Sequence, residues 1–325
     1  MRILIVGGAG MIGQKLVARL VKDGKLGASA IKHIVLSDVV APAIPSAPFP
    51  IQARVGDLSE PGQAEVLIRE KPDVIFHLAA IVSGEAEADF ERGYRINLDG
   101  TRHLFEAIRR VQYQPRVVFT SSIAVFGAPF PEAIGDEFFL TPLTSYGTQK
   151  AIDELLLSDY SRRGFFDGVG IRLPTICVRP GKPNRAASGF FSGIIREPLN
   201  GVEAVLPVSE DVRHWYASPR AAIGFLLHAG SMDTKVLGTR RNISMPGLSV
   251  TVGEQIEALK RVAGEKTASL IRRQSDSTIA QIVQGWPRNF STKRAVELGF
   301  RADQSFDEII RIYIEDELPQ GLKAS

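Results

Sequence analysis

A glycine-rich turn near the start of the chain constrains the fold more than any other feature. An apolar run of strand length, residues 3–6, stops at Gly7, and an amphipathic helical pattern begins at Met11. Gly7, Gly10 and Gly13 have a spacing that allows a tight turn, close approach of a pyrophosphate and close packing of the helix on the strand. The helix N-terminus would present amide groups to phosphates. The segment predicts a dinucleotide site, although such a turn can be purely structural.

The rest of the first half alternates short apolar runs with helical patterns. Further strands are expected at residues 33–37, 51–55, 74–77 and 116–120. Continuously apolar runs are typical of a parallel sheet that helices cover on both faces. Ligands of such sheets bind beyond the carboxyl ends of the strands. We therefore predict an α/β fold with a Rossmann-type doubly wound parallel sheet and a smaller C-terminal substrate lobe.

Asp38, directly after the second expected strand, bears on the choice of cofactor. A carboxylate at this place accepts hydrogen bonds from an adenosine ribose and repels a 2′-phosphate. The three residues that follow, Val39, Val40 and Ala41, bring no positive charge to neutralise such a phosphate. The sequence favours NAD over NADP. The alternative is that Asp38 only caps the strand end.

Tyr146 and Lys150 form the reactive part of the predicted site. They are four residues apart in a helical pattern and so share one face. A tyrosine titrates near ~10, and a nearby ammonium favours the ionised phenol that could act as a base. Ser122, just after the fifth expected strand, adds a hydroxyl. Each residue alone could be structural, but together with the glycine turn they predict hydride transfer.

The motifs occur in the order and approximate spacing of the extended short-chain dehydrogenase/reductase family, which the chain resembles over most of its length. The matching segments are GGAGMIG at 7–13, Asp57-Leu58, 77–80, Asn97, 121–127 and 146–150. The resemblance implies that Ser122 hydrogen-bonds the reacting oxygen and that Tyr146 transfers the proton. It implies that Lys150 contacts the nicotinamide ribose and lowers the pKa of the tyrosine.

The resemblance also implies the contacts of the cofactor. Asp57 and Leu58 would flank adenine, Ala79 and Ala80 would lie beside the cofactor, and Asn97 would order the site from within a helix. The full set expected to bind NAD is Gly7, Gly10, Met11, Ile12, Gly13, Asp38, Asp57, Leu58, Ala79, Ala80, Asn97, Tyr146 and Lys150.

Beyond residue 173, prolines and glycines interrupt the pattern, so we expect the substrate lobe to begin there. Residues 1–173 would form the NAD-binding domain, with 212–235 returning to it. Residues 174–211 and 236–325 would form the substrate-binding lobe. Thr251 with Glu254, and Ser305 with Glu308, predict capping boxes at two helix starts.

The substrate expectations depend on departures from the family pattern. Nucleotide-sugar epimerases usually carry an asparagine where this chain has Thr175, which makes a nucleotide sugar doubtful. Arg213 matches an arginine that meets a phosphate in those epimerases, and its guanidinium suits a carboxylate equally well. Lys182, Asn184 and Arg185 add polar and positive groups, unless this loop is simply solvated.

Segments 174–184, 188–198 and 213–220 resemble those of enzymes that oxidise a four-carbon sugar acid, D-erythronate, at the hydroxyl next to its carboxylate. The expected substrate contacts are Ser83, Ser122, Tyr146, Thr175, Arg185 and Arg213. The alternatives are a nucleotide-sugar epimerase or dehydratase with retained NAD, a uronate dehydrogenase, and a redox-sensing binding protein. Net release of NADH would distinguish a dehydrogenase from an epimerase.

Composition narrows the remaining classes. The 39 basic and 36 acidic residues are interspersed, so no nucleic-acid partner is expected. The single cysteine, Cys177, rules out an intramolecular disulfide, and the five histidines have no ligand spacing, so no metal is expected. Without a signal-peptide pattern or an apolar run of membrane length, a cytoplasmic enzyme with no membrane partner is expected. Family resemblance makes a homodimer an open alternative to a monomer.

Overall fold

The computed structural model describes residues 1–181 and 188–318, which form two compact units. Unit 1 comprises Met1–Val125, Thr144–Leu173 and Ile223–Met245. Unit 2 comprises Phe126–Leu143, Pro174–Ala222 and Pro246–Ser325. Each unit is built from three separate stretches of the chain.

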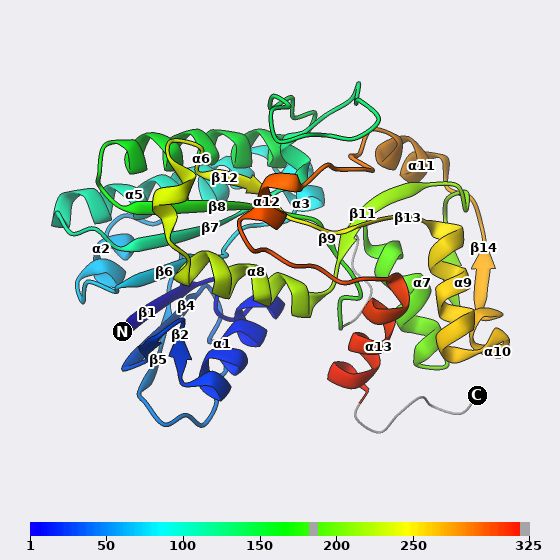
Figure 1. The fold of residues 1–325 in the computed structure, drawn as a ribbon, viewed down its shortest axis with the longest axis horizontal. Coiled ribbons are helices and arrows are strands. Elements are labelled where there is room, and N and C mark those ends of the chain that lie inside the picture. Colours follow the sequence, from blue (N-terminus) through cyan, green and yellow to red (C-terminus); the bar gives the residue numbers. More distant parts are fainter. Residues whose placement is uncertain (182–187, 319–325) are drawn as a thin grey trace. The chain divides into compact units, whose positions relative to one another are not determined.

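A seven-stranded parallel sheet forms the centre of unit 1, in the order β12-β8-β7-β6-β1-β4-β5 (Figure 1). The chain runs outward from β1 through β4 to β5, and then crosses to β6 and proceeds outward on the other side. This is the predicted doubly wound arrangement, and its switch point lies between β1 and β6. The strands are β1 (Arg2–Val6), β4 (His33–Asp38), β5 (Ile51–Val55), β6 (Val74–His77), β7 (Arg116–Ser122), β8 (Asp167–Leu173) and β12 (Asn242–Ser244).

Helices cover both faces of this sheet. Figure 1 shows α5 (Gly100–Val111) and α6 (Ser145–Arg162) on one face, and α1 (Met11–Asp23) with most of α8 (Pro219–Ser231) on the other. All four residues of β6 are buried, as expected for a strand covered on both sides. Leu104, Phe105 and Ile108 recur at helical spacing and join a buried apolar cluster with strand residues.

The shorter elements of unit 1 complete its connections. They are the hairpin β2 (Lys25–Leu26) and β3 (Ser29–Ala30), helices α2 (Gln63–Ile68), α3 (Ser83–Ala88) and α4 (Phe90–Gly93), the π-helix η1 (Tyr94–Asp99), and the 3-10 turns η2 (Ile123–Val125) and η3 (Thr234–Leu237). The π-helix runs into α5, so a single longer helical region begins with an irregular turn that contains Asn97.

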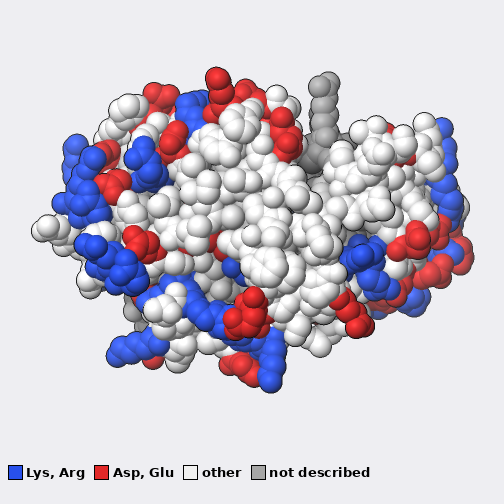
Figure 2. Space-filling view, turned by 90° about the horizontal axis from the view of Figure 1, so that it is seen from above, with Lys and Arg blue, Asp and Glu red and all other residues white. Residues whose placement is uncertain are grey.

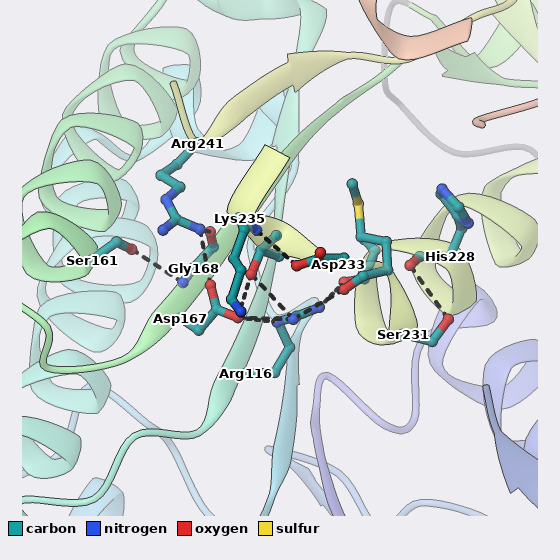
Figure 3. Close-up of polar contacts among 12 residues, drawn as sticks. Arg116, Ser161, Asp167, Gly168, His228, Ser231, Asp233, Lys235 and Arg241 are labelled. Carbon is teal, nitrogen blue, oxygen red and sulfur yellow. Dashed lines mark hydrogen bonds and ion pairs between the residues drawn. The ribbon is translucent and has the colours of Figure 1, made fainter. Parts of the chain in front are cut away.

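A polar network fastens the returning segment to the amino ends of β7 and β8 (Figure 3). Arg116 Nε donates to Asp167 Oδ2 at 2.8 Å, and its terminal nitrogens donate to the carbonyl oxygens of Ala229 and Met232 at 2.8 and 3.2 Å. Arg241 Nη1 donates to Asp167 Oδ1 at 2.9 Å. Arg116 thus satisfies carbonyl groups that the end of α8 leaves without helical partners.

The units differ from the expected domain boundaries at two places. The segment that returns to unit 1 is Ile223–Met245 rather than 212–235, because β12 pairs with β8 there while β11 (Arg213–Ala217) pairs inside unit 2. Phe126–Leu143, expected in the first domain, belongs to unit 2. Its Ile134 forms a bridge with Phe290 of that unit.

Unit 2 contains two small sheets and several helices around an apolar core. β11 pairs antiparallel with β13 (Leu248–Thr251) and parallel with β9 (Thr175–Ile176), while β10 (Ala204–Leu206) pairs with β14 (Ile271–Arg273). The helices are α7 (Gly189–Leu199), α9 (Val252–Ala263), α10 (Glu265–Ala268), α11 (Ser277–Gln284), α12 (Lys293–Glu297) and α13 (Phe306–Glu317). The rings of Phe191 and Phe306 both pack edge-on against the ring of Tyr216 in this core.

Helix starts in unit 2 follow the predicted capping chemistry with one difference. Thr251 and Glu254 form a complete capping box at the start of α9. At α13, Ser305 accepts a hydrogen bond from the Glu308 amide, but the Glu308 carboxylate accepts from the Gln304 amide at 2.6 Å instead of from Ser305. In the described part of the chain, every helix is too short or too polar to cross a membrane.

Candidate active site

In the glycine turn between β1 and α1, a side chain would clash at two of the three glycine positions and would fit at the third. Gly7 has φ of +91°, and a Cβ there would lie 2.7 Å from the Ala79 nitrogen. A Cβ on Gly13 would lie 2.3 Å from the Gly7 carbonyl oxygen, so the helix could not pack so closely on the turn. A Cβ on Gly10 would meet nothing closer than 3.5 Å. The protein itself therefore does not require glycine at position 10 for steric reasons.

Asp38 ends β4 and holds the turn through its side chain. Its Oδ2 accepts a hydrogen bond from the Ala9 amide at 2.9 Å, and its Oδ1 accepts one from the Val39 amide at 2.7 Å. Asp38 therefore caps the end of the strand, and this does not decide whether it also binds a cofactor. Because each carboxylate oxygen can accept more than one hydrogen bond, the side chain also retains capacity for a ribose. Met11 and Ile12 form the first turn of α1 beside it.

Asp57 lies after β5 in a compact polar group that includes a residue the sequence analysis missed. Its Oδ1 accepts from the Ser59 amide and hydroxyl at 2.9 and 2.6 Å, and its Oδ2 accepts from Arg95 at 3.0 Å. Burial acts to raise the pKa of Asp57, but the hydrogen bonds from Ser59 and Arg95 outweigh it and leave the pKa below its usual value. Leu58 beside it is buried. No sequence signal pointed to Arg95, because its contact depends on a long-range pairing.

Asn97 lies buried in η1 and connects the loop after β6 to α6. Its Oδ1 accepts from the Ile81 amide at 2.9 Å, and its Nδ2 donates to Ile81 O at 3.2 Å and to Gln149 Oε1 at 2.7 Å. Ala79 and Ala80 precede Ile81 in the same loop, and Ser83 begins α3 just after it. Asn97 therefore fixes this loop relative to the helix that carries Tyr146 and Lys150.

Tyr146 lies in the first turn of α6, where capping contacts fix the helix start. Thr144 Oγ1 accepts from the Gly147 amide at 3.0 Å, and the Glu87 carboxylate accepts from the Ser145 amide. The pKa of Tyr146 is raised to about 12. Burial is the main cause, a hydrogen bond with Ser122 acts to lower the pKa, and the charge of Asp153 acts to raise it. β7 runs to Ser122, two residues further than predicted, so this hydroxyl belongs to the strand end.

Lys150 is 2% exposed and lies one turn further along α6. Its Nζ is 4.5 Å from the ring centroid of Phe119 and 5.9 Å from that of Tyr146. Burial lowers the pKa of Lys150 to about 8, and Asp153 and Glu154 act to raise it. Tyr146, Ser122 and Lys150 are therefore brought together in unit 1, as predicted, while their catalytic roles stay predictions.

Two buried carboxylates on α6, Asp153 and Glu154, were not identified from the sequence. Glu154 accepts from Ser121 Oγ at 2.5 Å and from Arg172 Nε and Nη2 at 2.9 and 2.7 Å. Asp153 is fully buried. Their positions, three and four residues after Lys150, place them near the lysine on the helix, and this spacing was the available signal.

The expected substrate residues fall into three groups. Ser83, Ser122 and Tyr146 belong to unit 1, whereas Thr175 and Arg213 belong to unit 2. Thr175 Oγ1 lies 2.7 Å from Nε2 of the buried His214, and Arg213 donates to Ser249 O at 2.7 Å and pairs with Glu254 at 3.3 Å. Arg185, with Lys182 and Asn184, lies outside the described residues.

Charged residues on the surface are mixed in sign. Figure 2 shows Lys and Arg interspersed with Asp and Glu on the face that it draws. Within residues 1–181 and 188–318, no three His, Cys, Asp or Glu side chains gather as metal ligands would. Cys177 is buried, and burial raises the pKa of its thiol to about 12, which makes a nucleophilic thiolate unfavourable.

Residues 3–226 match the NAD dependent epimerase/dehydratase family, and the chain belongs to this family. This confirms the family resemblance and the prediction of NAD as cofactor. Among individual proteins, the chain is 50% identical to a D-erythronate dehydrogenase of Cupriavidus necator, over 97% of this chain and 98% of the relative. It is 42% identical to a D-erythronate dehydrogenase of Haemophilus influenzae, over 98% of this chain and 100% of the relative.

Solved structures show the same fold. A crystal structure from Agrobacterium tumefaciens, described as a nucleoside-diphosphate-sugar epimerase, is 65% identical with a TM-score of 0.97, covering 99% of this chain and 96% of the other. An L-threonine dehydrogenase from Cupriavidus necator is 22% identical with a TM-score of 0.82, covering 97% of this chain and 99% of the other. The second likeness bears on the fold alone.

Proposed function

We propose that this chain is an NAD-dependent D-erythronate dehydrogenase that oxidises D-erythronate to 2-dehydro-D-erythronate. The observation that carries the proposal is identity of 50% and 42% to two D-erythronate dehydrogenases over nearly the whole chain. The similarity includes unit 2, where a different substrate would require different side chains. The resemblance of segments 174–184, 188–198 and 213–220 to those of D-erythronate-oxidising enzymes led to the same expectation from the sequence.

Three side chains of unit 1 carry the chemistry in this proposal. Tyr146 accepts the proton of the substrate hydroxyl, Ser122 holds the oxygen by a hydrogen bond, and Lys150 stabilises the phenolate. Bound NAD supplies the nicotinamide ring that accepts the hydride. A tyrosine with a pKa of about 12 is a poor base near neutral pH, so positive charge beyond that of Lys150, such as that of the oxidised nicotinamide, is needed close by.

The glycine turn and Asp38 bind the cofactor in this proposal. The open space at Gly10 and the amides of the first turn of α1, at Met11 and Ile12, suit a pyrophosphate. The Asp38 carboxylate at the end of β4 suits a ribose with a free 2′-hydroxyl and disfavours a 2′-phosphate. Asp57, Leu58, Ala79 and Ala80 line the adenine and ribose side, and Asn97 orders the loop beside them.

We propose that Thr175, Arg213 and Arg185 recognise the substrate together with Ser83. The exposed fraction of the Arg213 side chain, 37%, supports access to an anion in spite of its ion pair with Glu254. A carboxylate substrate would compete with Glu254 for this guanidinium. We further propose a cytoplasmic enzyme and a homodimer, for which light scattering of the purified protein is the direct test.

An assay of the purified protein with NAD and D-erythronate tests the proposed function. NADH should accumulate in proportion to the substrate consumed, and NADP should support a much lower rate. A panel of four- to six-carbon aldonates and uronates provides the comparison. Failure to form NADH with D-erythronate, while a uronate reacts, would assign the chain to the uronate dehydrogenases instead.

A second candidate is a nucleoside-diphosphate-sugar epimerase with retained NAD. The observation that favours it is the 65% identity to the Agrobacterium tumefaciens protein described in those words. Such an enzyme returns the hydride and releases no NADH. Conversion of a nucleoside-diphosphate sugar to its epimer without net NADH, and no reaction with D-erythronate, would establish it.

A further inference from the structure

The buried face of α6 carries two carboxylates, and only one of them has hydrogen-bond partners among the described residues. Glu154 receives a bidentate contact from Arg172 and a further bond from Ser121. Neither carboxylate oxygen of Asp153 has a hydrogen-bond partner among the described residues, although the residue is 0% exposed. An ionised carboxylate that is buried without partners is strongly destabilising unless an opposite charge compensates it, and otherwise such a group takes up a proton.

Lys150 is the cation that acts on Asp153 in the described part of the chain. Arg172 pairs with Glu154, whereas the ammonium of Lys150, three residues before Asp153 on the same helix, lowers the pKa of Asp153 by its charge. Lys150 is itself 2% exposed and so needs a nearby negative charge to remain protonated. The two requirements match each other.

The neighbouring groups do not provide an alternative charge. Thr101 of α5 faces Asp153, but its single hydroxyl proton is donated to the Asn97 carbonyl at 2.5 Å. His77 of β6 lies 2.9 Å from the Thr101 hydroxyl, and burial together with Lys150 lowers its pKa to about 3. His77 is therefore neutral, and the charged groups facing the pair are Glu154, already matched by Arg172, and the ionisable Tyr146.

We propose that Asp153 is a positioning residue of the active site, whose buried negative charge keeps the Lys150 ammonium protonated beside Tyr146. It acts through Lys150 and touches neither substrate nor cofactor. The inference rests on the proposed catalytic role of Lys150. It adds a third ionisable side chain, besides Tyr146 and Lys150, to the set that determines the pH range in which the enzyme works.

The sign of the expected pH effect follows from the charge that is removed. Asp153 raises the pKa of Lys150 and also that of Tyr146. Asp153→Asn keeps the shape of the side chain and removes the charge, so both pKa values fall. Because both pKa values fall, both limbs of the kcat profile should move in the same direction. We expect the profile to shift toward acid by about one pH unit.

The kinetic experiment compares wild type, Asp153→Asn and Asp153→Glu with NAD and D-erythronate across pH. Asp153→Glu retains the charge and should retain the position of the profile, whatever happens to its height. Asp159→Asn, which changes an exposed carboxylate of the same helix, is the matched control and should leave the profile unchanged. A profile of Asp153→Asn that is lower but not shifted would mean a purely structural role and overturn the proposal.

An infrared measurement tests the charge of Asp153 without any substrate, so it separates failure of this inference from failure of the proposed function. Burial raises the pKa of Asp153 well above its usual value, and the positive charge of Lys150 acts to lower it. In Lys150→Met, Asp153 should therefore become protonated at neutral pH and give a carboxylic-acid C=O band. That band should be absent from wild type and from the double variant with Asp153→Asn. The same band in wild type would overturn the proposal, even if Asp153→Asn does not fold.

Discussion

Tyr146 is the residue on which the proposed chemistry depends most directly. Tyr146→Phe removes only the phenolic oxygen, and the ring can stay in place because the contacts at the start of α6 come from Thr144 and Glu87. We expect kcat to fall by about two to four orders of magnitude, the usual contribution of general acid–base catalysis. NAD affinity, measured by calorimetry, should stay within a few-fold of wild type. Near-normal turnover would remove Tyr146 from the mechanism.

Glu154, the residue after Asp153 on α6, forms a buried ion pair with Arg172 that should contribute to stability. Glu154→Gln leaves Arg172 without its carboxylate at a position where the two side chains are 1% and 11% exposed. Breaking such a pair from one side typically costs about 3–5 kcal/mol, so the urea midpoint should fall markedly. Asp159→Asn, in an exposed pair with Arg162, should change stability by less than about 1 kcal/mol. Equal effects of the two changes would contradict the importance of the buried pair.

At the scale of elements, substitutions in the glycine turn can distinguish a glycine needed for packing from one needed for binding the cofactor. Gly13→Ala would place a Cβ 2.3 Å from a carbonyl oxygen and should displace α1, lowering both stability and NAD affinity. Gly10→Ala meets only ordinary contacts, so it should fold normally and lose NAD affinity through contact with the pyrophosphate. Gly224→Ala, with open space around it, is the control for both. Thermal unfolding and calorimetry report the two quantities; unchanged NAD affinity in Gly10→Ala would place the phosphates elsewhere.

The elements of unit 1 could largely be predicted because their signals are local. The apolar runs, the glycine spacing and the helical register of Tyr146 and Lys150 each lie within a few residues of sequence. Arg95 and β12 could not be found in this way, since an ion pair with Asp57 and a three-residue strand beside β8 depend on distant parts of the chain. The spacing of Asp153 from Lys150 could be seen in the sequence. Its burial, and its lack of hydrogen-bond partners among the described residues, could be seen only in the structure.

For the whole molecule, the discontinuous course of unit 1 has a consequence for fragments of the chain. The seventh strand of the sheet and most of α8 come from Ile223–Met245, after a long excursion into unit 2. Without this segment, β8 would become an exposed edge, and Arg116 would lose the carbonyl oxygens of Ala229 and Met232. Phe76 would also lose its covering contact near Gly230.

We therefore predict that residues 1–173 expressed alone do not form a stable NAD-binding domain, although they contain every predicted cofactor contact. Circular dichroism should show a broad thermal transition or none, and calorimetry should show no NAD binding. The full-length chain should unfold cooperatively and be stabilised by NAD, because a ligand that binds only the folded state adds about 2.7 kcal/mol at 100 times its Kd. In the full chain, Asp167→Asn weakens the Arg116 and Arg241 contacts without deleting a strand and should lower stability while retaining NAD binding. A cooperative, NAD-binding 1–173 fragment would show that the returning segment is dispensable for the cofactor site.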